Sequence, residues 1–171
     1  SGLEQEFQNW IAPYVQEDAL NSTMYVDCAH HAMGVGNVLR YGLRGLQRQA
    51  QARLQTEKDV EKQTFLRCVI RAEDAVMRLC ARFTDEAERL CGTERDPVVQ
   101  ARLARIAISA RRCPAEPAET FFEALNTMLL LKELGNGLES MGFAILGHVD
   151  RVLAPYYARD VQLGRLTVAQ A

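Results

Sequence analysis

The densest group of chemically versatile side chains lies near the start of the chain, where Cys28, His30 and His31 occur close together. Thiolate and imidazole groups are common zinc ligands, and a metal site needs three or four of them to converge. In this sequence only His148 and distant cysteines could complete such a set. We therefore predict no metal site. A histidine here either contacts a ligand or is a partly buried loop residue with ordinary hydrogen bonds.

Two further kinds of motif carry little functional signal. The segment Gly34-x-Gly36 has two of the glycines of a phosphate-binding loop, but it follows no predicted strand and lacks the third glycine and the Lys-Ser/Thr pair. Turn geometry explains it better. Neighbouring carboxylates such as Glu73-Asp74 and the pair Glu86 and Glu88 fall on predicted solvent faces, where charge usually serves solubility.

The five cysteines are best interpreted as reduced thiols. Their number is odd and no Cys-x-x-Cys occurs, which argues against a disulfide framework or a zinc ribbon. Cys80 and Cys91 fall inside a predicted helix without a neighbouring base, so we expect them to be inert. No Ser-His-Asp or Cys-His arrangement stands out. The residues alone predict no catalytic site in this chain.

Composition bounds the class of protein. A chain of 171 residues has the size of one ordinary domain, and 48% apolar with 25% charged residues is usual for globular proteins. A net charge of −2 argues against a dedicated nucleic-acid binder. No apolar run approaches the roughly 20 residues that span a membrane, and no signal peptide is visible. We expect a cytoplasmic protein with no membrane or nucleic-acid partner.

Apolar residues recur at helix spacing in four long segments, and these must position any functional side chain. The predicted helices are Val38–Gln55, Val60–Leu90, Pro97–Ala110 and a helix from near Pro117 to a stop at Gly135-Asn136-Gly137. Asn37 is a candidate cap of the first helix. Gly92 is expected to end the second helix, and Asp96 is expected to cap the third, with proline at its first position.

Two of these helices are expected to contribute most of the core. In the second, a stripe of apolar residues at three- and four-residue steps should face the interior: Phe65, Val69, Ala72, Val76, Cys80, Phe83, Ala87 and Leu90. Exposing this stripe to water would lose several kcal/mol of hydrophobic free energy, at roughly 25 cal/mol per Å² of apolar surface. In the fourth, Phe121–Leu131 is apolar almost all round, which predicts burial among neighbouring elements.

The two ends of the chain are less regular. Residues 1–30 are expected to be irregular, and Gly142 to Val149 is the one segment that fits a short buried strand, whose partners would have to lie outside this chain. A short helix should follow at Asp150–Tyr157. Thr167 with Gln170 fits a capping box, which predicts that a further helix begins there. The natural protein is therefore expected to continue. The predicted fold is mainly α, with at most one or two short strands.

Two segments resemble motifs of the pyruvate formate-lyase-like glycyl-radical enzymes. Pro114 to Leu125, within Arg-Arg-Cys-Pro-Ala-Glu-Pro-Ala-Glu-Thr-Phe-Phe-Glu-Ala-Leu, resembles the turn and Thr-Phe-x-Glu-Ala-Leu helix of that family. Gly147 to Tyr157 resembles its Gly-Arg-x-Asp-x-x-Leu-x-Pro-Tyr segment, and Asp160 with Gly164-Arg165-Leu166-Thr167 continues the match. His30 is similar in position to the histidine of the Gly-His loop of the family. The resemblance identifies 1–171 as a partial domain of this kind, with 1–30 as an irregular segment within it.

The resemblance implies a multi-helix segment of a large α/β barrel enzyme. Such enzymes cleave C–C, C–N, C–O or C–S bonds, or act as formate acetyltransferases. They carry a glycyl radical that a partner radical-SAM activase installs and that passes to a cysteine on a central loop. No cysteine here lies in such a loop and no Arg-Val-x-Gly motif occurs. We therefore expect no catalytic residue and no cofactor in this chain, which alone should be inactive.

The implied partners are the rest of the barrel, the activase and a small-molecule substrate. His30 is the one residue that the resemblance nominates for substrate binding. Departures from the family pattern occur at His148, which replaces an arginine, and at Phe143 and Ile145, which replace hydroxyl-bearing residues. The alternative is a non-catalytic helical interaction module or degenerate homologue. In either case part of Phe121–Leu131 is expected to be exposed and to favour self-association into a homo-oligomer.

Overall fold

The computed structural model describes Gln5, Asn9, Ala12 and residues 29–138 and 143–170, and it is mainly helical. Its elements are β1 (Ala29–Ala32), α2 (Val35–Thr56), α3 (Val60–Thr93), α4 (Pro97–Arg112), α5 (Phe121–Leu138), β2 (Phe143–Ile145), α6 (Val149–Gln162) and the 3-10 turn η1 (Val168–Gln170). The prediction of a mainly α fold is confirmed. Within these residues no helix is both long and apolar enough to cross a membrane.

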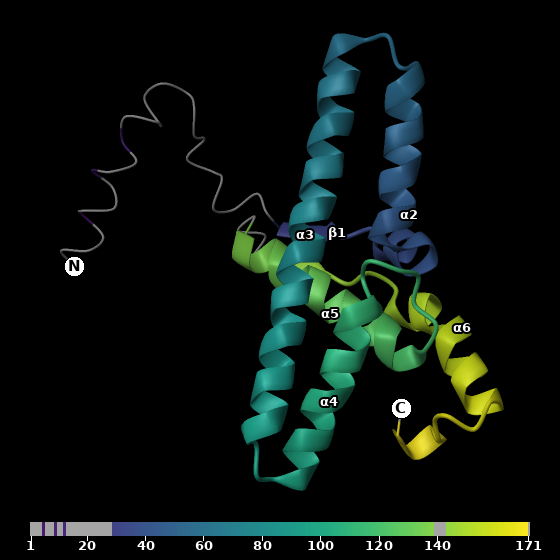
Figure 1. Cartoon of the computed structure of the whole chain (residues 1–171). Coiled ribbons are helices and arrows are strands. Elements are labelled where there is room, and N and C mark those ends of the chain that lie inside the picture. Colours follow the sequence, from purple (N-terminus) through teal and green to yellow (C-terminus); the bar gives the residue numbers. More distant parts are fainter. Residues whose placement is uncertain (1–4, 6–8, 10–11, 13–28, 139–142, 171) are drawn as a thin grey trace.

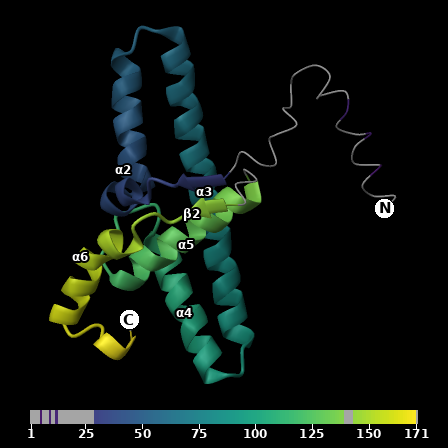
Figure 2. The same ribbon diagram turned by 180° about the vertical axis from the view of Figure 1, so that it is seen from behind.

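Helix α3 is the element against which both α2 and α4 pack. Its 34 residues extend over about 50 Å at 1.5 Å per residue. Helix α2 packs along one half of it and α4 along the other, each antiparallel to α3, so that two hairpins share one long helix (Figure 1). Helix α5 crosses near the middle, with the strand pair beside it and α6 on the flank (Figure 2).

Short polar side chains set the starts of α3 and α4. The Asp59 carboxylate accepts hydrogen bonds from the backbone N–H groups of Glu61 and Lys62, at 2.9 and 3.2 Å. Asp96 accepts one from the N–H of Val98 at 2.8 Å, and Pro97 occupies the first turn. These acceptors satisfy donors that a helix N-terminus otherwise leaves without partners. The predicted start of α4 at Asp96-Pro97 is confirmed.

Several predicted helix boundaries are wrong by a few residues. Helix α2 begins at Val35, so Asn37 lies within its first turn and does not cap it. Helix α3 continues through Gly92 to Thr93, and α5 continues through Gly135-Asn136-Gly137 to Leu138. A glycine inside a helix costs only about 1 kcal/mol relative to alanine. Tertiary packing outweighs that amount, and the buried position of Gly135 suits a residue without a side chain.

Helix α2 is interrupted at Gly42, where φ is 65° and ψ is 162°. Beyond this break the N–H groups of Leu43 and Arg44 donate to the carbonyl oxygens of Pro114 and Ala115, at 2.8 and 3.0 Å. The N–H of Ala118 returns a bond to Leu39 O at 3.0 Å. The connection between α4 and α5 is thereby fastened to the kink of α2.

The predicted core stripe of α3 is confirmed for half of its residues, since Val69, Val76, Cys80 and Ala87 are buried or half-buried and the other four are exposed. Cys80 and Ala87 are buried, but Phe65 is 67% exposed and Phe83 49% exposed. The face that packs lies about 100° further round the helix, one position along in sequence. It comprises Gln63, Leu66, Ile70, Glu73, Met77, Cys80, Thr84 and Ala87, all buried or half-buried. This face includes polar residues, because α2 and α4 cover it with long side chains as well as apolar ones.

The main core lies where α2, α5, α6 and the α4–α5 connection meet. Its buried members are Val35, Leu39, Cys113, Ala118, Ala124, Met128 and Leu153. Within Phe121–Leu131, Ala124 and Met128 are fully buried, whereas Leu129 is 45% exposed. The expectation of a buried helix with part of its surface exposed is confirmed for α5.

Candidate functional site

The strand pair brings distant segments of the chain together. Strands β1 and β2 are parallel, with Ala29 opposite Phe143 and Ala32 opposite Ile145. The expectation that the partners of β2 lie outside the chain is therefore wrong, since β1 pairs with it. Strand β1 could not be predicted from the sequence, because its four residues (Ala-His-His-Ala) show no alternation of apolar and polar residues. The carboxyl ends of the two strands meet at one edge.

All three histidines of the chain gather at this sheet. His30 and His31 lie on β1, and His148 follows β2 at the position before α6. The expectation of an irregular segment over residues 1–30 is wrong for Ala29 and His30, which belong to β1. The rest of segment 1–30, Cys28 included, lies outside the described residues except for residues 5, 9 and 12.

The described residues contain no group of three or more His, Cys, Asp or Glu side chains placed to hold a metal ion. His148 is exposed and makes no side-chain cap bond to α6. The parallel strand pair fixes the backbone positions of His30 and His31. The contact of His30 with a substrate stays a prediction.

The start of α5 is held by a capping box. The Thr120 hydroxyl accepts a hydrogen bond from the Glu123 N–H at 3.1 Å. The Glu123 carboxylate reaches back and accepts from the N–H groups of Glu119 and Thr120, at 2.7 and 3.2 Å. Thr-x-x-Glu is the sequence signature of this device. This capping box is not among the features predicted from the sequence, although the spacing of Thr120 and Glu123 was the signal available.

A second acceptor for α5 comes from the far end of α6. Asp160 is only 4% exposed, and its Oδ2 accepts from the Phe121 N–H at 2.8 Å. Its backbone carbonyl accepts from the N–H groups of Arg165 and Leu166, and the Arg165 guanidinium lies 3.6 Å from Oδ1. The rings of Phe121 and Tyr157 meet edge to face at 6.0 Å. The buried carboxylate thus lies at the N-terminal end of α5.

Arg112 connects the end of α4 to the same capping box. Its guanidinium donates to the Pro117 carbonyl at 2.6 Å and to Glu123 at 3.1 Å, and it lies 3.0 Å from Glu119. The segment Pro114 to Leu125 is joined to α6 by the hydrogen bond between Phe121 and Asp160 and by the ring contact between Phe121 and Tyr157. This unit positions the connection that leads from α5 to β2 and α6.

The buried thiols are poor candidates for ionic chemistry. Burial raises the pKa of Cys80 and of Cys113 to about 11 in each case. Both therefore stay protonated near neutral pH, whereas thiolates are the nucleophiles and metal ligands. Cys68 is exposed, and the Cys91 thiol donates to the Gln100 carbonyl at 3.6 Å. Cys80 and Cys113 accordingly serve packing rather than nucleophilic catalysis.

The sequence profile of the family "Pyruvate formate lyase-like" matches residues 5–171. The chain belongs to this family. Isethionate sulfite-lyase of Desulfovibrio desulfuricans is 30% identical over 141 residues, which are 78% of this chain and 17% of that enzyme. The chain therefore spans about a sixth of the length of this curated relative.

Solved structures place these helices in the same class of enzyme. A structure described under 1,2-propanediol dehydration in Roseburia inulinivorans superposes with a TM-score of 0.74 and 26% identity, over 82% of this chain and 18% of that one. A glycyl radical enzyme from Archaeoglobus fulgidus gives a TM-score of 0.68 and 24% identity, over 81% and 18%, and this second likeness shows the fold. The chain is a multi-helix segment of the glycyl radical enzyme fold.

Proposed function

We propose that this chain is part of a glycyl-radical lyase or dehydratase that acts on a small molecule in the cytoplasm. The observation that carries the proposal is the α5–α6 unit, because the residues that match the family motifs are those that meet there through Thr120, Glu123 and Asp160. The names of the relatives, a sulfite-lyase and a propanediol-dehydrating protein, favour C–S or C–O cleavage over the formate acetyltransferase reaction.

The parent enzyme would carry a glycyl radical that a radical-SAM activase installs. Passed to a cysteine, this radical would supply hydrogen-atom abstraction from the substrate. These 171 residues contain neither of the motifs for that chemistry. The residues of this chain would instead position the strand pair, hold β2 against α5 and present His30 to the substrate. Their contribution to the reaction would be binding and orientation.

The assignment of His30 can be tested in the parent enzyme. One hydrogen bond to a polar or charged substrate group is worth about 1–3 kcal/mol, so His30→Gln should lower kcat/KM about ten- to a hundredfold, mainly through KM. His31→Gln removes the same residue type from the same strand and serves as the matched control. Equal effects of the two substitutions would assign the loss to β1 itself rather than to a substrate contact of His30.

The competing function is a non-catalytic helical interaction module or a degenerate homologue. The residues that favour it are His148, Phe143 and Ile145, which depart from the family pattern. The deciding experiment is electron paramagnetic resonance of the whole parent after anaerobic treatment with its activase. We expect a glycyl radical doublet; its absence in a correctly folded parent with a proven activase would favour the module.

A further inference from the structure

Three segments of the chain enclose a hollow of about 250 Å³ beside the start of α5. Its wall consists of the second half of α4, the first turn of α5, and the end of α6 with the turn that follows it. Figure 1 shows this last turn folding back toward α4. Since a water molecule takes about 30 Å³ in the liquid, the hollow has room for a small organic molecule. We call it the α4–α6 hollow.

One oxygen of Asp160 has no hydrogen-bond donor at this hollow. The Asp160 side chain lines the hollow and is only 6% exposed. Its Oδ2 accepts from the Phe121 N–H, but its buried Oδ1 accepts no hydrogen bond from the described residues. The Arg165 guanidinium lies 3.6 Å from Oδ1, which is beyond hydrogen-bond length. A bound group that carries an O–H or N–H would satisfy this buried acceptor.

Two hydroxyl groups of the lining supply donors. The Ser109 oxygen accepts a hydrogen bond from Asn126 Nδ2 at 3.1 Å. The Thr120 oxygen accepts from the Glu123 N–H at the same distance. Each hydroxyl hydrogen then remains to be donated, and neither has an acceptor among the described residues. Because Ser109 is only 2% exposed, its hydroxyl needs an acceptor inside the hollow.

Two guanidinium groups border the same space. Arg105 makes no ion pair with the described residues, and its guanidinium lies over the Phe122 ring at 4.4 Å. Stacking occupies the face of the guanidinium and leaves the N–H groups in its plane available to an anion. Arg165 is the second cation of the lining. Guanidinium groups with free N–H donors bind carboxylates through paired hydrogen bonds.

Two carboxylates also line the hollow, and they differ in what they still lack. Glu123 pairs with Arg112 at 3.1 Å, and its other oxygen accepts from two backbone N–H groups at the start of α5. Glu119 shares Arg112, but it is 59% exposed and lies outside the lining. Asp160 is therefore the carboxylate of the described lining that keeps an open oxygen. Its single charge faces two guanidinium groups, which favours an anion in the hollow.

We propose that the α4–α6 hollow binds a small organic anion that carries a hydroxyl group, of the short-chain hydroxy carboxylate class. Its carboxylate accepts hydrogen bonds from Arg105, Arg165 and the Ser109 hydroxyl, and its hydroxyl donates to Asp160 Oδ1. The apolar part of the lining contacts its carbon chain: Ile108, Phe122 and Leu166. A bare inorganic oxyanion would leave those apolar side chains without a contact. The inference goes beyond the proposed function, since none of these residues belongs to the strand pair that carries the histidines.

The test uses the whole parent protein and a readout at the hollow itself. The N–H groups of Arg165 and Leu166 donate to the Asp160 carbonyl, so a ligand held by this turn should slow their hydrogen exchange. Mass spectrometry of the peptide that contains residues 160–166 gives the ligand concentration for half-maximal protection. Binding at a distant substrate site does not enter this value. Absence of protection by lactate at any concentration would overturn the proposal and leave the hollow to solvent or to another part of the parent.

Ligands with one three-carbon skeleton test each contact. Lactate carries both polar groups, propanoate lacks the hydroxyl, and 1,2-propanediol lacks the carboxylate. In 2-fluoropropanoate a fluorine of similar size replaces the hydroxyl and cannot donate. Lactate should half-protect the peptide at a concentration at least about tenfold below the other three, because each of them leaves Asp160 Oδ1 or the guanidinium groups without a partner. Equal values for lactate and 2-fluoropropanoate would overturn the hydroxyl contact, and tighter binding of inorganic phosphate would overturn the organic class.

Substitutions on α4 complete the test. Arg105→Gln removes a cation of the hollow and should raise the half-protecting concentration of lactate at least about tenfold. Arg102→Gln, one turn earlier on the exposed surface of the same helix and outside the lining, is the matched control and should leave that concentration unchanged. Urea unfolding checks that both variants remain folded. A lactate response that is the same in the two variants would place the anion elsewhere and overturn the proposal.

Discussion

The backbone N–H of Phe121, the first residue of α5, donates a hydrogen bond of 2.8 Å to the carboxylate of Asp160, close to the end of α6. Two residues distant in sequence thereby share one buried polar contact. The Arg165 guanidinium lies 3.6 Å from the other oxygen of the same carboxylate. This contact joins the Pro114–Leu125 segment to Asp160, two parts of this sequence that resemble the family.

Loss of the Asp160 carboxylate should destabilise the fold strongly. Asp160→Ala leaves the Phe121 N–H buried without an acceptor, and such a loss costs about 2–3 kcal/mol. Asp160→Asn keeps an acceptor and should cost less. Urea unfolding of the chain measures both changes, with Asp150→Ala, an exposed residue in the first turn of α6, as the control. Similar losses for Asp160→Ala and Asp150→Ala would contradict the capping role.

The Thr120 hydroxyl should contribute a measurable part of the stability of α5. Thr120→Ala removes the acceptor for the Glu123 N–H and should lower the free energy of unfolding by about 1 kcal/mol. Thr120→Ser retains the hydroxyl and should be close to neutral. Amide hydrogen exchange at Glu123 gives the local readout, and it should accelerate in the alanine variant alone. Equal exchange rates in both variants would show that the hydroxyl does not protect this amide.

Helix α3 shows what periodicity determines and what it leaves open. Its sequence carries two lines at near-heptad spacing: the apolar line through Phe65 and Phe83, and the mixed line through Ile70, Glu73 and Thr84. Apolarity favours the first line, yet the second packs. The choice depends on which surfaces cover α3. Phe65, Phe83 and Leu90 of the apolar line are exposed among the described residues, so these large members lie on the surface rather than in the core.

The start of α4 was predicted correctly, because it depends on residues close together in sequence. Asp96 with Pro97 starts α4 through a capping bond and a preset φ angle, and both effects act within a few residues. The pairing of β1 with β2 joins segments more than a hundred residues apart, and no local pattern in Ala29–Ala32 announces it. The family resemblance was carried by Pro114 to Leu125 and Gly147 to Tyr157, and these segments contain Thr120 and Glu123 of the capping box and the Tyr157 ring that meets Phe121.

A side chain at position 42 should disrupt the junction between α2 and the α4–α5 connection. A Cβ on Gly42 would lie 2.4 Å from the Ala115 carbonyl oxygen, and φ of +65° is strained for other residues. Gly42→Ala should therefore cost about 2 kcal/mol or more. Gly36→Ala lies on the same helix with open space around its Cβ and should be neutral or stabilising. Urea unfolding compares the two, and equal midpoints would contradict the close approach.

The Glu73 carboxylate should make stability depend on pH in the acidic range. Its Oε2 is buried without a hydrogen-bond partner among the described residues. Burial, together with the neighbouring charge of Asp74, raises the pKa of Glu73 above its ordinary value of 4.5. The folded chain therefore holds this proton more tightly than the unfolded chain. The stability from the protonated form is fully present below the unfolded pKa and is lost as pH rises through the folded value.

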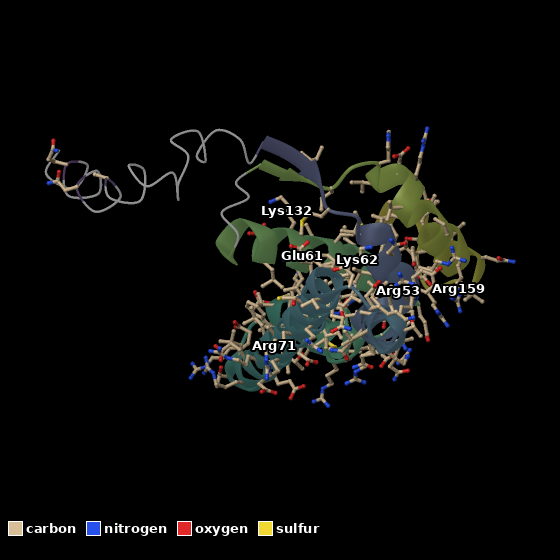
Figure 3. The ribbon with its side chains drawn as sticks, turned by 90° about the horizontal axis from the view of Figure 1, so that it is seen from above. Arg53, Glu61, Lys62, Arg71, Lys132 and Arg159 are labelled. Carbon is tan, nitrogen blue, oxygen red and sulfur yellow. The ribbon has the colours of Figure 1, made fainter. Side chains whose placement is uncertain are left out.

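Glu73→Gln imitates the protonated side chain and should raise the free energy of unfolding at pH 7. The difference from the original chain should shrink as pH falls toward 4.5 and vanish below it, because both chains are then neutral at this position. Glu61→Gln changes an exposed carboxylate in the first turn of the same helix (Figure 3) and should give no stabilisation at pH 7. Urea unfolding from pH 4 to pH 8 measures the three proteins. A gain for Glu73→Gln that persists unchanged at pH 4 would show that packing, rather than the buried charge, is its cause.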